Sequence, residues 1–233
     1  MFDPVIDFTT GLLAAIADLV TPLAGGNAQA VAIILLTLAV RLSLLPLSVL
    51  AARGERSRLR LAPELARLNK RYARNRERLQ REVAALYARE KSSPLAGCLP
   101  SLAQVPFFML IYQVAAAPST HTLFGAPLGQ QVASVIGGFG LFSVPTLAMA
   151  VLLALLFAVA WATSRRIRLT AAAQPAGPAP VDAVRRIMPL MPYGTVLAAL
   201  VLPVATGLYL LASTTWTMVE RATLYPKPGA ATA

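Results

Sequence analysis

The chain has 233 residues, of which 57% are hydrophobic, and its mean hydropathy is +0.63. Soluble domains are roughly 45–50% apolar, so this composition excludes an ordinary soluble protein and indicates a chain that crosses a membrane several times. Spans of about 20 residues use most of this length, which leaves room for one membrane domain. The formal net charge is +11, and the single cysteine, Cys98, excludes an intramolecular disulfide.

The first segment, residues 1–29, contains no basic residue. Between positions 4 and 20 the apolar residues recur at mostly helical spacing, and Asp7 and Asp18 lie off that stripe. This pattern predicts an amphipathic helix that lies in the membrane interface. The start of the chain is acidic where a signal peptide would be basic, so we expect no cleavage.

The first predicted span, residues 30–50, is apolar except for Arg41 near its middle. A charge at mid-membrane costs roughly 2.5–3.5 kcal/mol on insertion scales, so such residues usually face a bundle interior or a wet cavity. Arg41 is therefore the first candidate functional residue. The alternative is a structural arginine, satisfied by backbone carbonyls or by an acid on another helix. No other predicted span has Asp or Glu at its centre, which favours function, and Pro46 is expected to kink this span.

Residues 51–92 change to a charged, helical pattern that holds thirteen of the 21 Lys and Arg residues and five acidic residues. Leucines recur in two arms, and the interruption at residues 73–75 offers Asn75 as an N-cap. The pattern predicts two antiparallel helices joined by a tight turn. For a charge run in general, a solvated face is the first interpretation.

The second predicted span, residues 97–116, carries Gln104 and Gln113. Glutamines inside lipid are costly unless they hydrogen-bond between helices or line water, and the sequence does not separate these two roles. The segment that follows, 117–141, has no Lys, Arg, Asp or Glu, and its His121 lacks the neighbours that a metal site would need.

Three further spans are predicted at residues 142–164, 187–202 and 203–220, with a Pro/Ala-rich, loosely ordered loop at 165–186 and a short tail at 221–233. Pro203 divides the last uncharged run into two halves of 16 residues each. Each half makes about 24 Å of helix, which is short of a hydrocarbon core of about 30 Å. These two short helices are expected to thin the membrane locally.

The basic residues predict the orientation. Segments 1–29 and 117–141 contain none, whereas 51–92, 165–186 and the tail contain all twenty apart from Arg41. With five crossings, the positive-inside rule makes the N-terminus and 117–141 extracytoplasmic and puts the hairpin and the C-terminus in the cytoplasm. The predicted fold class is an all-α polytopic membrane protein with five transmembrane helices and a cytoplasmic helical hairpin.

The sequence offers no catalytic constellation, since it has one histidine, no Gly-rich phosphate loop and no metal-spaced Cys/His set. What remains is a candidate wet groove made of Arg41, Ser43, the two glutamines and the hydroxyl-rich run 213–217. At an effective dielectric constant near 20, a carboxylate about 4 Å from a guanidinium gains about 4 kcal/mol, comparable to the mid-membrane cost of one Asp. We expect a protein that is not an enzyme and that needs no cofactor or metal.

A series of motifs follows from residue 37 to residue 217. They are TLAVRLSLLPLS (37–48), PELARLNKRY and LQREVAALY in the hairpin, SPLAGCLPSLAQVPFFMLIYQV (93–114), FGAPLG (124–129), RRIMPLMP (185–192) and LPVATGLYLLASTTWT (202–217). Together, and in this order, they resemble the YidC/Oxa/Alb family of membrane protein insertases, in a short form without a large extracytoplasmic domain.

The resemblance implies five transmembrane helices around a hydrophilic groove that opens to the cytoplasm and the lipid. It also implies insertion of small membrane proteins in the bacterial cytoplasmic membrane, with nascent membrane proteins, the bilayer, the ribosome and the Sec translocon as partners and no DNA. The family's groove positions correspond to Arg41, Gln104 and Trp216, and the candidate groove also includes Ser43, Gln113 and Thr214. Recruitment of ribosome or substrate would fall to basic residues of the hairpin, namely Arg67, Lys70, Arg71, Arg74, Arg76 and Arg78.

Two other functions rank below insertion. A small transporter or channel would use Arg41 as an intramembrane anion site, but the sequence shows no repeated half with a second broken helix. An anchor that binds nucleic acid or lipid would use the basic hairpin and would not need Arg41.

Overall fold

The computed structural model describes residues 3–89, 109, 112, 121–172 and 186–224. Within these residues the fold is helical, as predicted for an all-α protein, apart from one two-stranded β pair. The elements are α1 (Asp3–Ala24), η1 (Gly25–Asn27), α2 (Ala28–Ser43), α3 (Leu45–Arg71), α4 (Arg76–Arg89), β1 (Thr122–Leu123), β2 (Ala126–Pro127), α6 (Val132–Phe139), α7 (Val144–Ala172), η2 (Met188–Tyr193), α9 (Gly194–Val201) and α10 (Val204–Leu224).

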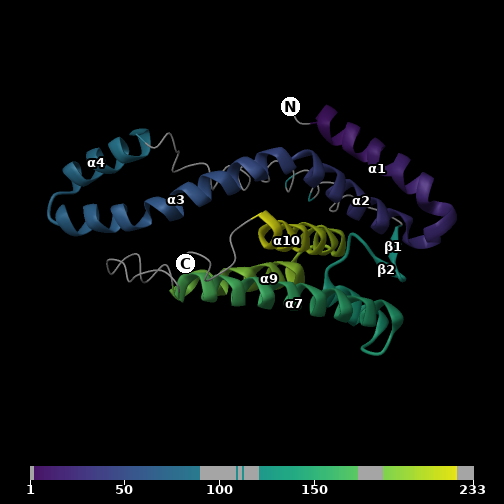
Figure 1. The fold of residues 1–233 in the computed structure, drawn as a ribbon. Coiled ribbons are helices and arrows are strands. Elements are labelled where there is room, and N and C mark those ends of the chain that lie inside the picture. The colour runs from purple at the N-terminus through teal and green to yellow at the C-terminus, as the bar shows by residue number, and fades with distance from the viewer. Residues whose placement is uncertain (1–2, 90–108, 110–111, 113–120, 173–185, 225–233) are drawn as a thin grey trace.

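Helix α1 turns back at η1 and packs along α2 (Figure 1). The reversal uses Gly25 at φ +53°, a left-handed conformation that glycine adopts without steric cost. Leu13 and Ala17 are buried on one side of α1, while Phe8 and Leu19 are 71% and 79% exposed on the other. A helix with one packed side and one exposed apolar side is suited to a position between protein and lipid.

The helix that carries Arg41 breaks at Leu44. Pro46 has no N–H to donate to the Leu42 carbonyl, and its ring crowds the preceding turn, so α2 ends at Ser43 and α3 starts at Leu45. The predicted kink in this span is therefore confirmed, and it begins two residues before the proline. α3 then runs without interruption to Arg71, so no helix boundary separates the predicted span 30–50 from the hairpin.

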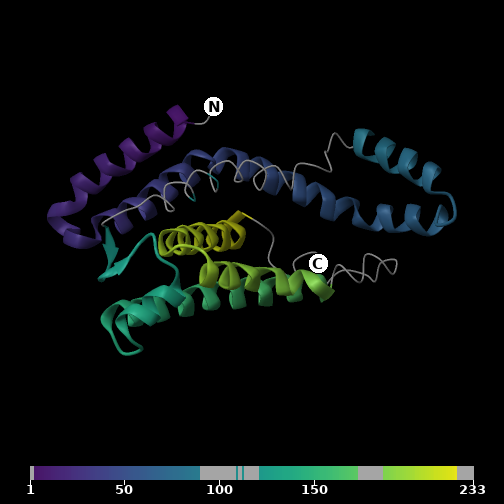
Figure 2. The same ribbon diagram turned by 180° about the vertical axis from the view of Figure 1, so that it is seen from behind.

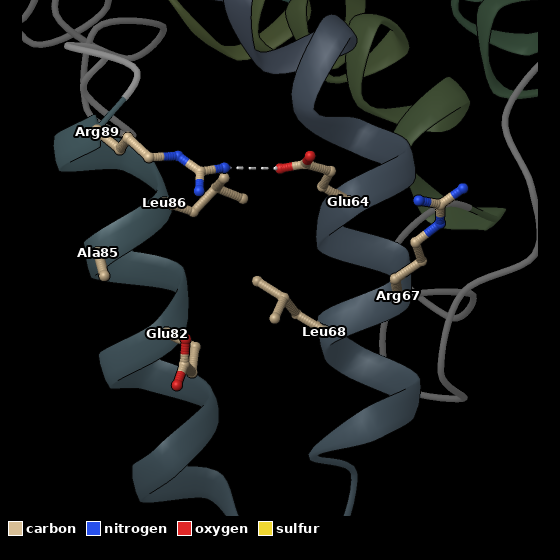
Figure 3. A pocket seen from close by; sticks show the side chains of 7 residues that line it. All are labelled: Glu64, Arg67, Leu68, Glu82, Ala85, Leu86 and Arg89. Atoms are coloured by element: carbon tan, nitrogen blue, oxygen red, sulfur yellow. Dashed lines mark ion pairs between the residues drawn. The ribbon is translucent and has the colours of Figure 1, made fainter.

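The predicted helical hairpin is formed by α3 and α4, which project beyond the rest of the bundle (Figure 1). Asn75 precedes α4, and its Oδ1 accepts the backbone N–H of Arg78 at 3.0 Å, as expected for an N-cap. Glu64 of α3 and Arg89 of α4 lie 3.5 Å apart and close one end of the space between the two helices (Figure 3).

Helix α10 is the centre of the bundle, since it packs against α2, α7 and α9 (Figures 1 and 2). Its first six residues, 204–209, are all buried, and so is Ser213 one turn further along the helix. Gly207 permits the closest approach, because a Cβ atom there would lie 3.2 Å from Leu152 Cδ2 of α7.

Among the described residues, two helical stretches are long and apolar enough to cross a membrane by length and composition: Asp7–Ser43, which includes the reversal at η1, and Val144–Thr170. Met188–Val201 is a shorter apolar stretch, in which Pro189 and Pro192 favour the 3-10 form of η2. Pro203 falls between α9 and α10, where Leu202 is extended, so the predicted division of the last apolar run is present. α7 continues to Ala172, eight residues past the predicted end at Ser164, because its Arg and Ala residues favour helix and no proline interrupts them before Pro175.

One loop ties two distant turns together at the end of the bundle opposite the hairpin. We call residues 121–131 the loop clamp; it contains the β1–β2 hairpin, whose turn places Phe124 at φ +49° and Gly125 at φ +87°. The Phe124 N–H donates to Asn27 Oδ1 at 2.7 Å. On the other side, the N–H groups of Val204 and Ala205 donate to the clamp carbonyls of Gln130 and Leu128 at 2.9 and 3.0 Å. The clamp thereby joins the α1–α2 turn to the start of α10.

Enlarging Gly207 should loosen the bundle. We expect Gly207→Leu to lower stability by about 1–3 kcal/mol, because its side chain overpacks the contact with Leu152. The matched control is Gly194→Leu, whose Cβ meets no atom within 4 Å. Thermal unfolding in detergent, followed by helical circular dichroism, measures both, and equal midpoints would contradict the close approach.

Removing the Asn27 side-chain acceptor should weaken the loop clamp. Asn27→Leu leaves the Phe124 N–H in a strained turn without its partner, so we expect a loss of about 1 kcal/mol and faster hydrogen exchange at that amide. Gln29→Leu, two residues away and with no hydrogen bond to another described residue, is the control. Unchanged exchange at Phe124 in Asn27→Leu would show that the bond does not hold the clamp.

Candidate functional site

Arg41 lies in the last turn of α2 and reaches across to α10. Its Nη2 donates to Ser213 Oγ at 2.5 Å and to the Ser213 carbonyl oxygen at 3.2 Å. Hydrogen bonds to charged groups contribute about 1.5–3 kcal/mol, which is of the order of the insertion cost of a mid-membrane charge. The site therefore begins with one guanidinium that a neighbouring helix holds at the junction of α2 and α10.

Two other titratable residues of α10 lie on the same side of the helix as Ser213. Tyr209 lies one helical turn before Ser213, and Glu220 lies about two turns after it. This spacing puts the tyrosine, the serine and the glutamate on one side of α10. The acid on this side of α10 thus lies near the end of the last helix and not at the centre of another span.

Two buried nitrogen donors at this site are unused within the described part of the chain. Arg41 Nε and Trp216 Nε1 are both buried and have no hydrogen-bond partner there. Trp216 follows Ser213 by three residues, so it lies on the adjoining part of the same helix face. Buried donors without acceptors are costly, which makes this junction suited to a carbonyl or carboxylate from another molecule.

The structure brings together some of the predicted groove residues and not others. Arg41 contacts α10 at Ser213, and Trp216 lies on α10 three residues after that serine, whereas Gln104 and Gln113 lie outside the described residues. Ser43 is exposed, and its hydroxyl donates to the Ala39 carbonyl of its own helix at 3.0 Å. Thr214 likewise donates to the Leu210 carbonyl at 2.6 Å. These two hydroxyls satisfy their own helices and do not contact Arg41.

Ser213, the hydrogen-bond partner of Arg41, belongs to the hydroxyl-rich run 213–217 that is part of the candidate groove predicted from the sequence. The sequence alone does not single it out, because nothing local distinguishes one hydroxyl of the run from the next. The signal that could have separated them is helical spacing, because Tyr209, Ser213, Trp216 and Glu220 recur at intervals of three or four residues.

The basic residues predicted for the hairpin lie on its surface. The side chains of Arg67, Lys70, Arg71, Arg74 and Arg78 are exposed, and that of Arg76 is outside the described part. Between α3 and α4 is an open cleft of about 320 Å³ in which Leu68 and Leu86 point toward each other (Figure 3). Its charged lining is balanced, with two Glu and two Arg, so it is not an anion site; the lining residues are Glu64, Arg67, Leu68, Glu82, Ala85, Leu86 and Arg89.

The fold and the site together define a helical integral membrane protein with a charged residue held inside the bundle. The model of the 60Kd inner membrane protein family matches residues 21–228. The chain belongs to this family, and the resemblance inferred from its motifs is confirmed. The family and the apolar helices also support the predicted location in the bacterial cytoplasmic membrane.

Several curated relatives named membrane protein insertase YidC are similar to parts of the chain. The protein of Clostridium perfringens is 40% identical over 89 residues, which are 38% of this chain and 37% of the relative. That of Oceanobacillus iheyensis is 36% identical over 120 residues, or 48% of each chain. That of Marinobacter nauticus is 45% identical over 84 residues, 36% of this chain and 15% of the relative. The matches thus cover less than half of the length of these relatives.

Removing the Ser213 hydroxyl should destabilise the site. Ser213→Ala takes away the acceptor of the shorter of the two hydrogen bonds from Arg41 to Ser213, so we expect a loss of about 1–3 kcal/mol. Thr214→Ala, the adjacent hydroxyl bonded only within its own helix, should change stability by less than about 1 kcal/mol. Thermal unfolding in detergent compares the two, and the reverse order of effects would overturn the assignment of Ser213.

Proposed function

We propose that the chain is a membrane protein insertase that binds the polar flank of a hydrophobic segment at Arg41 and releases the segment into lipid. The observation that carries this proposal is the junction of α2 and α10. There a permanent positive charge is held by Ser213 while two buried donors, Arg41 Nε and Trp216 Nε1, have no acceptor among the described residues. The names of the relatives support the same function.

The proposed topology has five crossings around a hydrophilic groove, an extracytoplasmic N-terminus and a cytoplasmic C-terminus. Under this topology, the loop clamp closes the extracytoplasmic end of the bundle, since its backbone bonds join the α1–α2 turn to α10. The α3–α4 hairpin then stands in the cytoplasm, where its basic residues obey the positive-inside rule. A groove closed on one side and open on the other admits a chain from the cytoplasm only.

In the proposed mechanism, a short acidic or polar flank of the substrate enters the groove and accepts hydrogen bonds from Arg41 and Trp216. At an effective dielectric constant near 20, an ion pair at about 4 Å gains about 4 kcal/mol, which offsets the cost of moving one carboxylate toward mid-membrane. The apolar part of the substrate then partitions into lipid, and burial of apolar surface drives the step. The short η2–α9 segment supports a locally thinned bilayer, which would shorten the path.

The proposed role of the hairpin is to recruit the nascent chain and its ribosome. Its exposed arginines and lysine supply positive charge that ribosomal RNA attracts without sequence specificity. Cooperation with the Sec translocon is part of the same proposal and concerns larger substrates.

Substitution of Arg41 tests the proposed function. In cells depleted of their own insertase, we expect Arg41→Ala to reduce insertion of a single-span substrate with an acidic flank several-fold. Insertion of a substrate with a neutral flank should fall less, because that flank needs no counter-charge. Arg41→Lys should restore part of the activity, because lysine keeps the positive charge. Its ammonium group lacks the fork of N–H donors with which a guanidinium can bind Ser213 and a substrate at the same time. Ser43→Ala, whose hydroxyl bonds only its own helix, is the control.

Photocrosslinking from positions 41 and 216 to a stalled nascent chain provides the direct measurement. Crosslinks from both positions would place a substrate at the α2–α10 junction. Full insertion by Arg41→Ala, with crosslinks confined to the hairpin, would contradict the groove mechanism. Saturable anion flux through liposomes without substrate insertion would favour a transporter instead.

A further inference from the structure

The outer surface of α7 is an uninterrupted apolar stripe that ends in arginines. Positions three or four residues apart along this helix are exposed on one face, while Met149, Leu152 and Leu156 are buried on the other. Figures 1 and 2 show α7 at the edge of the bundle, with its inner side toward α10. The large exposed side chains of the stripe are Leu147, Val151, Leu155, Phe157, Trp161 and Leu169.

The length of this stripe matches a bilayer. From Val144 to Arg165 the helix rises about 32 Å at 1.5 Å per residue, close to a hydrocarbon core of about 30 Å. If one end of α7 lies at one membrane interface, Arg165 lies at the level of the opposite headgroups. Trp161, one turn before it, is 52% exposed, as is usual for the aromatic residues that mark this interface.

Arg165 has a defined position at this level. Its guanidinium carbon lies 5.6 Å from the centre of the Trp161 ring, a cation–π contact that holds the charge over a lipid-facing aromatic. Arg168 is exposed three residues further on, a spacing that puts it on the same face of the helix as Arg165. A pair of arginines at this spacing fits the oxygens of one phosphate group.

The arginines at the end of α7 have no acidic neighbour on their own helix. The sequence contains no Asp or Glu from residue 91 to residue 181, so Arg165, Arg166 and Arg168 form a basic run. A solvated charge run usually mixes both signs, whereas this run is purely basic and directly follows the apolar stripe.

We propose that the end of α7 is a binding site for an anionic phospholipid, with the phosphate between Arg165 and Arg168 and the acyl chains along the apolar stripe beside Trp161. The site is specific to a membrane lipid, because a free phosphate would use the arginines but not the stripe. This inference concerns lipid binding and does not depend on insertase activity.

The test is quenching of Trp161 fluorescence by brominated lipid. The purified full chain in non-ionic detergent is titrated with dibrominated phosphatidylglycerol or dibrominated phosphatidylcholine. The signal of Trp161 is the difference between the wild-type chain and Trp161→Phe, which leaves Trp216 in place. We expect saturable quenching by the anionic lipid at concentrations at least about fivefold lower than by the zwitterionic one.

Arg165→Gln with Arg168→Gln should abolish that preference, measured against the same double variant carrying Trp161→Phe. Arg74→Gln with Arg78→Gln removes the same charge from the hairpin and should leave the preference intact, since neither side chain lies near α7. Equal quenching by the two lipids in the wild-type chain would mean only general contact with surrounding lipid and would overturn the proposal. Equal loss of this lipid preference in both double variants would show that only net charge matters, and it would overturn the proposal as well.

Discussion

The bundle depends on keeping one guanidinium satisfied in a mostly apolar setting. Arg41 is held by Ser213, and this contact is possible because α10 lies between α2 on one side and α7 and α9 on the other. The helices approach closely at Gly207, so the central helix needs a small residue one and a half turns from the serine that holds the charge. Helix α10 therefore provides both the close helix packing and the hydrogen-bond partner of Arg41, so a substitution in α10 affects both.

The two ends of the bundle are held together by different interactions. At one end, short backbone hydrogen bonds through the loop clamp join turns that are far apart in the sequence. At the other end, α3 leaves the bundle as a continuous helix, and α4 returns beside it across an open cleft that the Glu64–Arg89 pair spans. Arg56 of α3 also donates a hydrogen bond to the Leu224 carbonyl oxygen of α10 at 2.7 Å. Exposed ion pairs contribute at most about 1 kcal/mol, so the Glu64–Arg89 pair adds little to the stability of the hairpin.

Much of the architecture could be predicted from the sequence because it follows from local chemistry. Pro46 and Pro203 remove backbone donors and separate helices, Asn75 caps α4, and the long apolar run after residue 142 can only be a helix if it lies in lipid. Helix ends without such a signal were missed, as at α7, where eight residues beyond Ser164 remain helical since neither Arg nor Ala stops a helix. Arg41 itself stood out because a charge in an apolar run is costly.

What only the tertiary structure decided is which groups meet. Four hydroxyl residues and Trp216 follow one another at 213–217, and helix geometry gives each a different direction, so that Ser213 contacts Arg41 whereas Thr214 bonds its own helix. The burial of Arg41 Nε and Trp216 Nε1 depends on how α2 and α10 pack, a relation between residues more than 170 positions apart. The sequence by itself determined that a charged residue interrupts a long apolar helix, because both features are local. Only packing determined that Ser213 binds this charge and that Arg41 Nε is buried without an acceptor among the described residues.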